Sequence, residues 1–189
     1  MTDGNRQTGL RAQRTRKAIK TAFENMICNQ EDRGITVSKV AECAGVSRKT
    51  FYLHFTCIED LFDDTVGEVC DGYAQALAAL QTPVSNDDVN KTFFEYFAEQ
   101  DLFVDRLMSQ DGYREYADRI LQCTVDANCK CLGVAGYLDH QEAKVMDSFV
   151  VRNQFHLYHQ WIACGKQIPL DRLIELAHEH LYSGMDSII

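Results

Sequence analysis

The chain has 189 residues, a formal net charge of -9 at pH 7, 46% hydrophobic residues and only 2 prolines. This length is enough to bury a substantial core, and the composition indicates an ordered, mainly helical globular protein. No run of about 18 apolar residues is present, which argues against a membrane-spanning protein. The first residues lack the apolar segment of a secretory signal, so we expect a cytoplasmic protein.

The charge is distributed unevenly along the chain. Residues 1–55 hold 10 Lys and Arg against 5 Asp and Glu, a net +5, whereas residues 56–189 hold 9 against 23, a net -14. A basic first third followed by an acidic remainder predicts a site for a polyanion at one end only. The acidic part is expected to repel nucleic acid and so to orient its binding.

Helical periodicity dominates from the amino terminus onward. Apolar residues share one stripe of residues 11–30, and Arg14, Lys20 and other cations lie largely off it. Two short helices are predicted within residues 36–55. The longer apolar patterns that follow predict helices around 58–80, 86–99, 101–109, 112–132, 141–163 and 170–183. Because no strand-like alternation persists, we predict an all-α fold of about nine helices.

Local start and stop signals support several of these boundaries. Ser85 stands three residues before Asp88, which predicts a capping box at the start of the 86–99 helix. Gly165 and Pro169 follow the 141–163 helix and predict its end.

The 8 cysteines, at positions 28, 43, 57, 70, 123, 129, 131 and 164, form no C-x-x-C pair. In a reducing compartment we expect most of them to be small buried side chains, without a disulfide framework. A less favoured alternative is a soft-metal site built on Cys123, Cys129 and Cys131 with His156 or His159. Another is a redox switch built on the same three cysteines. A helix does not place positions 129 and 131 on one face, and nothing in the sequence lowers the thiol pKa. We therefore predict no metal site and no cofactor.

The stretch "TVSKVAECAGVSRKTFYLHF", residues 36–55, carries the strongest local signals. Thr36 can cap a first short helix, and Ser47 can cap a second one. Gly45 can adopt the left-handed conformation that ends the first helix sharply. Two short capped helices joined by a tight turn form a helix-turn-helix.

The second of these helices is expected to carry Arg48, Lys49, Thr50 and Tyr52 on its outward face. Its positive dipole end and its side chains suit phosphates and base edges in a DNA major groove. The alternative is a basic surface helix that only contacts solvent. We favour it less, because both short helices are capped and both lie in the net-positive first third of the chain. Motifs of enzymes, such as G-x-S-x-G, a phosphate-binding glycine loop or H-E-x-x-H, are absent, so we predict no catalytic activity.

The stretch "ITVSKVAECAGVSRKTFYLHF", with the basic helix before it and "EDLFDD" after it, resembles the DNA-binding domain of TetR-family transcriptional regulators. The resemblance covers residues 11–65, and the Tyr-x-His-Phe ending distinguishes this family from other helix-turn-helix proteins. It implies a DNA-binding domain over residues 1–56 and a helical regulatory and dimerisation domain over residues 57–189. It also implies a homodimer, most often a repressor, on a palindromic double-stranded DNA operator.

The family's DNA contacts transfer to this chain position by position. The resemblance implies DNA contacts by Arg14, Thr36, Lys39, Ser47, Arg48, Lys49, Thr50, Tyr52 and His54. Among these, Tyr52 and His54 are expected to bind phosphates. Family members usually carry Lys directly after the closing Phe and again two residues later, whereas this chain has Thr56 and Ile58. Phosphate binding at the start of the next helix is therefore expected to be weaker.

The resemblance assigns dimerisation to the helices over 141–163 and 170–183, although both can equally be core helices of a monomer. Effector binding is expected in the middle of the regulatory domain. Candidate pocket residues are Phe93, Phe97, Phe103, Tyr113, Tyr116, His156 and Trp161, each of which can also be plain core. An alternative is control by a protein partner, because the tail "WIACGKQIPLDRLIELAHEHL" is similar to a TetR-like branch that includes activators of dihydroxyacetone kinase operons.

Overall fold

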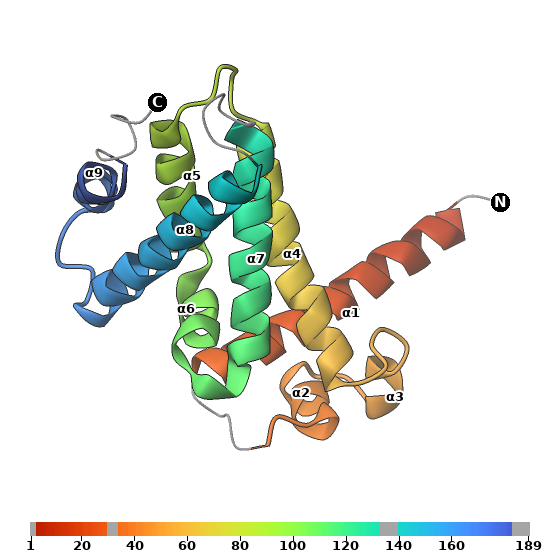
Figure 1. Cartoon of the computed structure of the whole chain (residues 1–189). Coiled ribbons are helices and arrows are strands. Elements are labelled where there is room, and N and C mark those ends of the chain that lie inside the picture. The colour runs from red at the N-terminus through yellow and green to blue at the C-terminus, as the bar shows by residue number, and fades with distance from the viewer. Residues whose placement is uncertain (1–2, 30–33, 133–139, 183–189) are drawn as a thin grey trace. The chain divides into compact units, whose positions relative to one another are not determined.

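The computed structural model describes residues 3–29, 34–132 and 140–182 of the chain (Figure 1). Within these ranges it contains nine α-helices, one short 3-10 helix and no strand, which confirms the predicted all-α fold. None of the described helices combines the length and the apolar character needed to cross a membrane.

The helices follow one another in the order expected from the sequence. They are α1 Asp3–Cys28, α2 Val37–Cys43, α3 Arg48–Phe51, α4 Ile58–Ala78, α5 Asn86–Glu99, α6 Asp101–Ser109, the 3-10 helix η1 Asp111–Tyr113, α7 Arg114–Leu132, α8 His140–Ala163 and α9 Leu170–Leu181. The chain divides into two compact units, Met1–Thr65 and Val66–Ile189, and α4 contributes to both. The functional boundary expected after residue 56 stays a prediction.

The amino-terminal unit is built from α1, α2, α3 and the first turns of α4. One face of α1 supplies Ile19, Phe23 and Ile27 to its core, all fully buried. The ring of Phe23 meets that of Phe62 of α4 edge to face, with the centroids 4.5 Å apart. Phe51 at the end of α3 is also fully buried, so the helix-turn-helix is held by the same apolar core.

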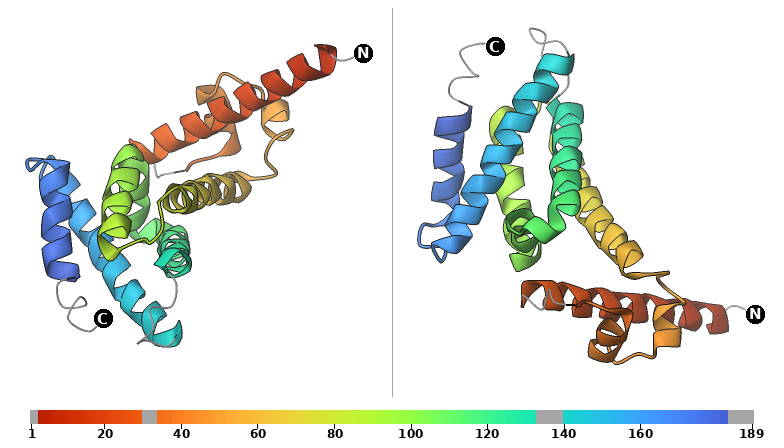
Figure 2. Two further views of the ribbon diagram at one scale, coloured as in Figure 1. Left: turned by 90° about the horizontal axis from the view of Figure 1, so that it is seen from above. Right: turned by 60° about the horizontal axis from the view of Figure 1, so that its bottom comes forward.

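The carboxy-terminal unit is a bundle of the rest of α4 with α5 to α9. Here α7 packs against α8, and α9 packs against α5 and α8. Figure 2 shows α9 beside α8 in both views. Phe93 and Phe97 of α5 pack on Phe155 of α8 at centroid distances of 4.8 and 4.7 Å. Tyr73 of α4 joins the cluster 5.3 Å from Phe97. Offset and edge-on ring pairs of this kind form the centre of this unit's core.

Two of the expected helix boundaries are confirmed by their hydrogen bonds. The Ser85 hydroxyl accepts from the Asp88 N–H at 3.2 Å, and the Asp88 carboxylate accepts from the Ser85 N–H at 2.9 Å. The Ser85 hydroxyl also donates to Asp88 Oδ2 at 2.6 Å. This bond, followed by that from the Ser85 N–H, lowers the pKa of Asp88. At the end of α8, Gly165 has φ 70° and its N–H donates to the Ile162 carbonyl at 2.8 Å.

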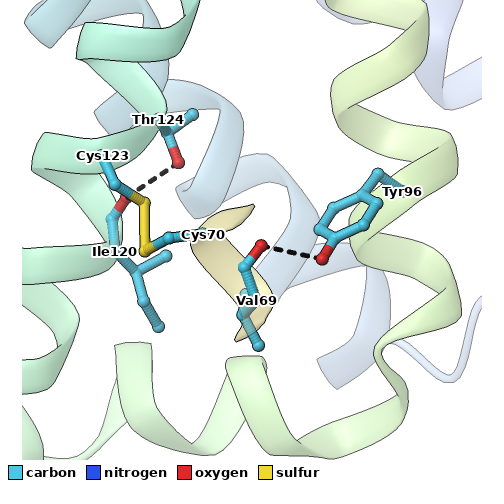
Figure 3. The surroundings of a disulfide bond; sticks show 6 residues. All are labelled: Val69, Cys70, Tyr96, Ile120, Cys123 and Thr124. Carbon is cyan, nitrogen blue, oxygen red and sulfur yellow. Dashed lines mark hydrogen bonds between the residues drawn. A yellow bond between two sulfur atoms is a disulfide. The ribbon is translucent and has the colours of Figure 1, made fainter. Parts of the chain in front are cut away.

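The cysteines depart from the sequence prediction in two ways. Cys70 of α4 and Cys123 of α7 form a disulfide with their Cα atoms 5.9 Å apart, so the expectation of no disulfide is wrong for this pair (Figure 3). None of the other six is fully buried either, because Cys43 and Cys164 are exposed and the rest are half-buried. The pair is separated by 53 residues, and only the packing of α4 on α7 brings it together. Among the described residues, no group of three or more His, Cys, Asp or Glu is placed to hold a metal ion.

Candidate nucleic-acid interface

The first helix of the helix-turn-helix begins and ends with local hydrogen bonds. The Thr36 hydroxyl accepts from the Lys39 N–H at 3.4 Å at the start of α2. At its end, Gly45 adopts φ 67°, which confirms the left-handed conformation predicted for it. The N–H groups of Gly45 and Val46 donate to the Glu42 and Ala41 carbonyls at 3.0 and 2.9 Å. These two bonds satisfy carbonyls that would otherwise lack partners and turn the chain sharply.

The second helix is short and is also capped as predicted. Ser47 precedes α3 in an extended conformation, and its hydroxyl accepts from the Thr50 N–H at 3.0 Å. The α-helix itself ends at Phe51. The chain continues in helical turns, because the N–H groups of His54 and Phe55 donate to the Phe51 carbonyl at 2.9 and 3.0 Å. Tyr52 and His54 therefore lie in turns that extend the recognition helix, rather than within a longer regular helix.

The recognition segment has a buried and an exposed side. Phe51 and Phe55 are buried, whereas Arg48 and Lys49 are exposed and Tyr52 is 50% exposed. The other predicted contact residues are placed as follows: Ser47, Thr36, Lys39 and, on α1, Arg14 are exposed, and Thr50 and His54 are half-buried. Leu53, which the sequence reasoning did not single out, is 75% exposed beside Tyr52. All nine predicted residues are thus accessible at least in part, and their contact with DNA stays a prediction.

A charged cluster that the sequence did not indicate joins α1 to α4 within this unit. Arg16 and Lys20 both pair with the Asp64 carboxylate, with Lys20 Nζ 2.9 Å from Asp64 Oδ2. Lys20 is 5% exposed, so its expected position off the buried stripe is wrong. Arg16 and Lys20 are four residues apart, which is the spacing that brings two side chains to one face of a helix. That spacing shows only that the two cations share a face of α1, and it does not indicate Asp64 as their partner.

Arg16 also supports the end of the recognition segment. Its guanidinium lies 4.6 Å from the centroid of the Phe55 ring and donates to the His54 carbonyl at 3.4 Å. A cation over an aromatic face is attracted by the ring quadrupole. Through these contacts the segment that carries Tyr52 and His54 is anchored to α1.

The start of α4 forms an acidic cap. The Thr56 N–H and hydroxyl donate to Asp60 Oδ2 at 2.7 and 3.0 Å. These bonds, the backbone one foremost, lower the pKa of Asp60, and a backbone hydrogen bond lowers that of Glu59. The two carboxylates therefore stay ionised at neutral pH. At the two positions where the family pattern has Lys, this chain has Thr56 and Ile58, and two negative charges follow directly at Glu59 and Asp60.

The predicted effector residues lie in several parts of the carboxy-terminal unit. Phe93 and Phe97 pack together in the aromatic cluster, and Phe103 of α6 is buried. Trp161 is 9% exposed, and its indole N–H donates to the Ile168 carbonyl at 2.8 Å. The remaining three are less buried: Tyr113 and Tyr116 are half-buried, and His156 is exposed on α8. The seven do not converge on one site in the described residues, and their role in binding an effector stays a prediction.

Two cavities are formed by described residues of this unit. One, of about 250 Å³, lies between the carboxy-terminal ends of α4 and α7 and is lined by Ala74, Leu77, Ala78, Leu80, Thr82, Val84, Ala127, Lys130 and Cys131. The other is a cleft of about 320 Å³ between α5 and α9, lined mainly by charged residues such as Asp87, Lys91 and Glu175. None of the seven predicted effector residues lines either cavity.

Comparison with known proteins agrees with this geometry. The family model "Bacterial regulatory proteins, tetR family" matches residues 33–65, which span α2, α3 and the start of α4. The uncharacterized HTH-type transcriptional regulator YxbF of Bacillus subtilis (strain 168) is 29% identical over 79 residues, or 41% of this chain. Those residues are 21% of that protein, so this chain spans only about a fifth of the length of that relative.

Several solved structures share the fold of most of the chain. The fatty acid degradation regulator FadR from Bacillus halodurans has a TM-score of 0.67 at 18% identity, covering 90% of this chain and 96% of that one. FadR from Bacillus subtilis in complex with stearoyl-CoA has a TM-score of 0.61 at 21% identity, covering 89% and 98%. A tetR-family transcriptional regulator from Streptomyces coelicolor has a TM-score of 0.64 at 14% identity, covering 92% and 81%. At these identities the similarity establishes a common fold.

Proposed function

We propose that this chain, a TetR-family transcriptional regulator by its helix-turn-helix and its fold, binds a palindromic DNA operator as a homodimer. An effector of the carboxy-terminal unit then modulates operator binding, most simply as the release of a repressor. This assignment accounts for the uneven charge, because the net-positive residues 1–55 meet the polyanion and the acidic remainder stays away from it.

The observation that carries the proposal is the geometry of the recognition segment. Ser47 caps α3, and Phe51 and Phe55 fix the segment in the core, so its opposite side is presented to solvent. That side carries Arg48 and Lys49, which can donate hydrogen bonds to guanine edges and phosphates in the major groove. Tyr52 and Thr50 add hydroxyl groups suited to phosphate oxygens.

A dimer is favoured for two reasons. A four-residue recognition helix contacts few base pairs, and operator specificity in helix-turn-helix proteins usually comes from two half-sites one helical turn apart. In addition, α8 carries large apolar side chains on its exposed side, with Val145 68% and Phe149 60% exposed. Apolar side chains of this size gain free energy when a partner surface covers them. We assign the dimer interface to this side of α8, together with α9.

For the effector we propose an apolar molecule with an anionic group, such as a fatty acyl thioester of coenzyme A. Support comes from the B. subtilis FadR structure, which holds stearoyl-CoA, and from the cavity at the ends of α4 and α7. Its lining is mostly aliphatic, and Lys130 at its border can pair with an anion. At about 250 Å³ the cavity is smaller than the roughly 300–1,000 Å³ of ligand pockets in general, so it fits a short acyl chain or the end of a longer one.

Selection of bound fragments from the source genome by the purified full-length chain tests the proposal. We expect enrichment of a palindromic sequence whose half-sites lie about one helical turn apart. Acyl-CoA of increasing chain length is then added to the complex, with free coenzyme A as the control. Release by a protein partner from the same operon, and not by any acyl-CoA, would favour the partner-controlled alternative. If no double-stranded fragment is preferred at low ionic strength, the proposed DNA-binding function is wrong.

A further inference from the structure

One short stretch of α4 is attached to two neighbouring helices by three different contacts. Cys70 is covalently joined to Cys123 of α7, and Tyr73 donates from its hydroxyl to Asn128 Oδ1 of α7 at 2.7 Å. On the other side, the Tyr96 hydroxyl of α5 donates to the Val69 carbonyl of α4 at 2.8 Å. Figure 3 shows the disulfide and the Tyr96 bond on either side of the α4 backbone. Of the three contacts, the disulfide is the one that a redox reaction can make and break.

The disulfide is accessible to small reactants, because both Cys70 and Cys123 are half-buried rather than sealed in the core. Reduction also leaves at least one thiol with a partner. Cys123 Sγ lies 3.1 Å from the carbonyl oxygen of Ile120, which can accept a hydrogen bond from an S–H group there. A Cys123 thiol therefore has a hydrogen-bond acceptor on its own helix in the dithiol state.

The nearby thiols are poor competitors for this reaction. Burial, and after it the hydrogen bond to Asp147, raise the pKa of Cys129 to about 12, and burial also raises the pKa of Cys131. Because the thiolate is the species that attacks a disulfide, these two cysteines stay unreactive at neutral pH. Of the free cysteines of this unit, only the exposed Cys164 then remains as a competitor for exchange at the Cys70–Cys123 disulfide.

We propose that the Cys70–Cys123 pair is a reversible redox switch, which sets how firmly α4 is attached to α7 and thereby changes operator affinity. Its reductant is a low-molecular-weight thiol. One thiolate attacks a protein sulfur, the S–S bond breaks and a mixed disulfide forms; a second thiolate then displaces the protein thiol. The net reaction turns the protein disulfide and two thiols into a protein dithiol and one small disulfide, and the oxidation is its reverse. The operator part of this inference rests on the proposed DNA-binding function.

The coupling to DNA binding follows from the course of α4 along the chain. This helix runs from Ile58 to Ala78 without interruption and passes the division between the units at residues 65 and 66. Cys70 lies just after that division. In the oxidised state a covalent bond fixes α4 there, whereas in the reduced state α4 is held by non-covalent contacts alone, among them the two tyrosine hydrogen bonds described above. If the chain binds DNA as proposed, it works in the compartment that holds the DNA. Disulfides there are mostly transient and redox-sensing, which fits a switch better than a permanent crosslink.

The switch is tested in the full chain with Cys43→Ser and Cys164→Ser as a common background, since these exposed cysteines would otherwise crosslink separate molecules. Cys70→Ser and Cys123→Ser remove the pair, and Cys131→Ser is the matched control on the same helix as Cys123. Each protein is equilibrated in buffers of reduced and oxidised glutathione. Peptide mapping without reductant, hydrogen exchange of residues 66–78 and operator affinity are then measured in both states.

In the background protein and in Cys131→Ser we expect a 70–123 crosslink that forms and disappears with the glutathione ratio. Hydrogen exchange of α4 should rise on reduction, and operator affinity should differ by about fivefold or more, the low end of allosteric coupling. Cys70→Ser and Cys123→Ser should show neither redox response. The inference is wrong if no 70–123 crosslink forms, or if α4 exchange is the same in both states. Equal operator affinity in the two states would overturn its regulatory part. If neither redox state binds DNA, the proposed function is wrong. The hydrogen exchange of α4 then still shows whether the disulfide controls how firmly α4 is held.

Discussion

Gly72 of α4 lies directly against the side chain of Tyr96 of α5. A Cβ atom at Gly72 would clash with the Tyr96 hydroxyl and come within 3.2 Å of its ring carbon Cζ. The same hydroxyl donates to the Val69 carbonyl at 2.8 Å, and burial raises the pKa of Tyr96 to about 12. The missing side chain at position 72 therefore makes room for a neutral hydroxyl that ties α5 to the backbone of α4.

Gly72→Ala should destabilise the chain, because the added methyl group forces Tyr96 away from its hydrogen bond. Overpacking of this kind costs about 1–3 kcal/mol of the free energy of unfolding. Gly67→Ala is the matched control in the same helix. Its nearest neighbour is an Arg119 side-chain nitrogen at 4.0 Å, so alanine should instead stabilise by about 0.5–1 kcal/mol through helix propensity. Denaturant unfolding of the two variants measures both changes, and equal effects would show that Gly72 is not a packing requirement.

Lys49→Ala should weaken operator binding, since it removes an exposed cation from the recognition segment. If Lys49 contacts a phosphate, the slope of log affinity against log salt should fall by about one unit. Lys91→Ala removes the same charge from α5, where Lys91 is exposed and lies 3.8 Å from Glu95, and should leave both quantities unchanged. Fluorescence anisotropy titrations at several salt concentrations give both values. Unchanged affinity and slope in Lys49→Ala would remove this residue from the interface.

The helix-turn-helix was predictable from the sequence because its determinants are local. The caps at Thr36 and Ser47 and the turn at Gly45 each involve residues only a few positions apart. Such local patterns can be recognised from the sequence alone. The charged contact between Lys20 and Asp64 joins residues 44 apart. Nothing in the sequence near either residue indicates that partner.

The carboxy-terminal unit was predictable as helices but not as a set of contacts. The pairs Cys70–Cys123 and Tyr73–Asn128 depend on how α4 packs on α7, and periodicity shows which face of a helix is buried but not against which helix. For the same reason, the sequence does not tell which of the candidate effector residues lie together. Aromatic residues line cores and pockets alike, and Phe93 and Phe97 lie in the packed core of this unit, whereas His156 lies on its surface.

Phe149→Glu should dissociate the proposed homodimer, because it places a charge in the apolar side of α8 assigned to the interface. A central interface residue contributes about 2 kcal/mol or more, so the dissociation constant should rise at least tenfold. Leu102→Glu on α6, a position 38% exposed, is the control for an exposed apolar residue outside that side. Sedimentation velocity reports the oligomeric state, with circular dichroism to verify that both variants are folded.

Truncation after residue 140 should also abolish dimerisation. This deletion removes α8 and α9, including buried Phe155 and Tyr158, so it also tests the core and is less specific than Phe149→Glu. A dimeric truncation product, or a dimeric Phe149→Glu variant, would place the interface elsewhere.

Asp147→Asn should change the pH dependence of stability. Asp147 Oδ2 accepts from the Cys129 thiol at 2.9 Å, and burial raises the pKa of the Asp147 carboxyl. The pKa values of Tyr73, Tyr182 and Cys129 around it are also raised, so these groups stay neutral at and below neutral pH. Asp147 is therefore the group of this cluster that changes charge in the acidic range.

The sign of the effect follows from the direction of that shift. A carboxyl with a folded-state pKa above its unfolded value of about 3.9 adds stability below that value, and loses it as the pH rises through the folded-state pKa. At neutral pH the buried carboxylate thus lowers the free energy of unfolding. The neutral amide of Asn avoids this loss and still accepts the hydrogen bond from the Cys129 thiol. The variant should be more stable than the parent at about pH 7, with a smaller difference at about pH 4. Asp126→Asn, which removes an exposed carboxylate 2.9 Å from Lys144, is the control and should not stabilise at either pH. A stability difference between Asp147→Asn and the parent that is independent of pH would show that ionised Asp147 is not disfavoured by burial.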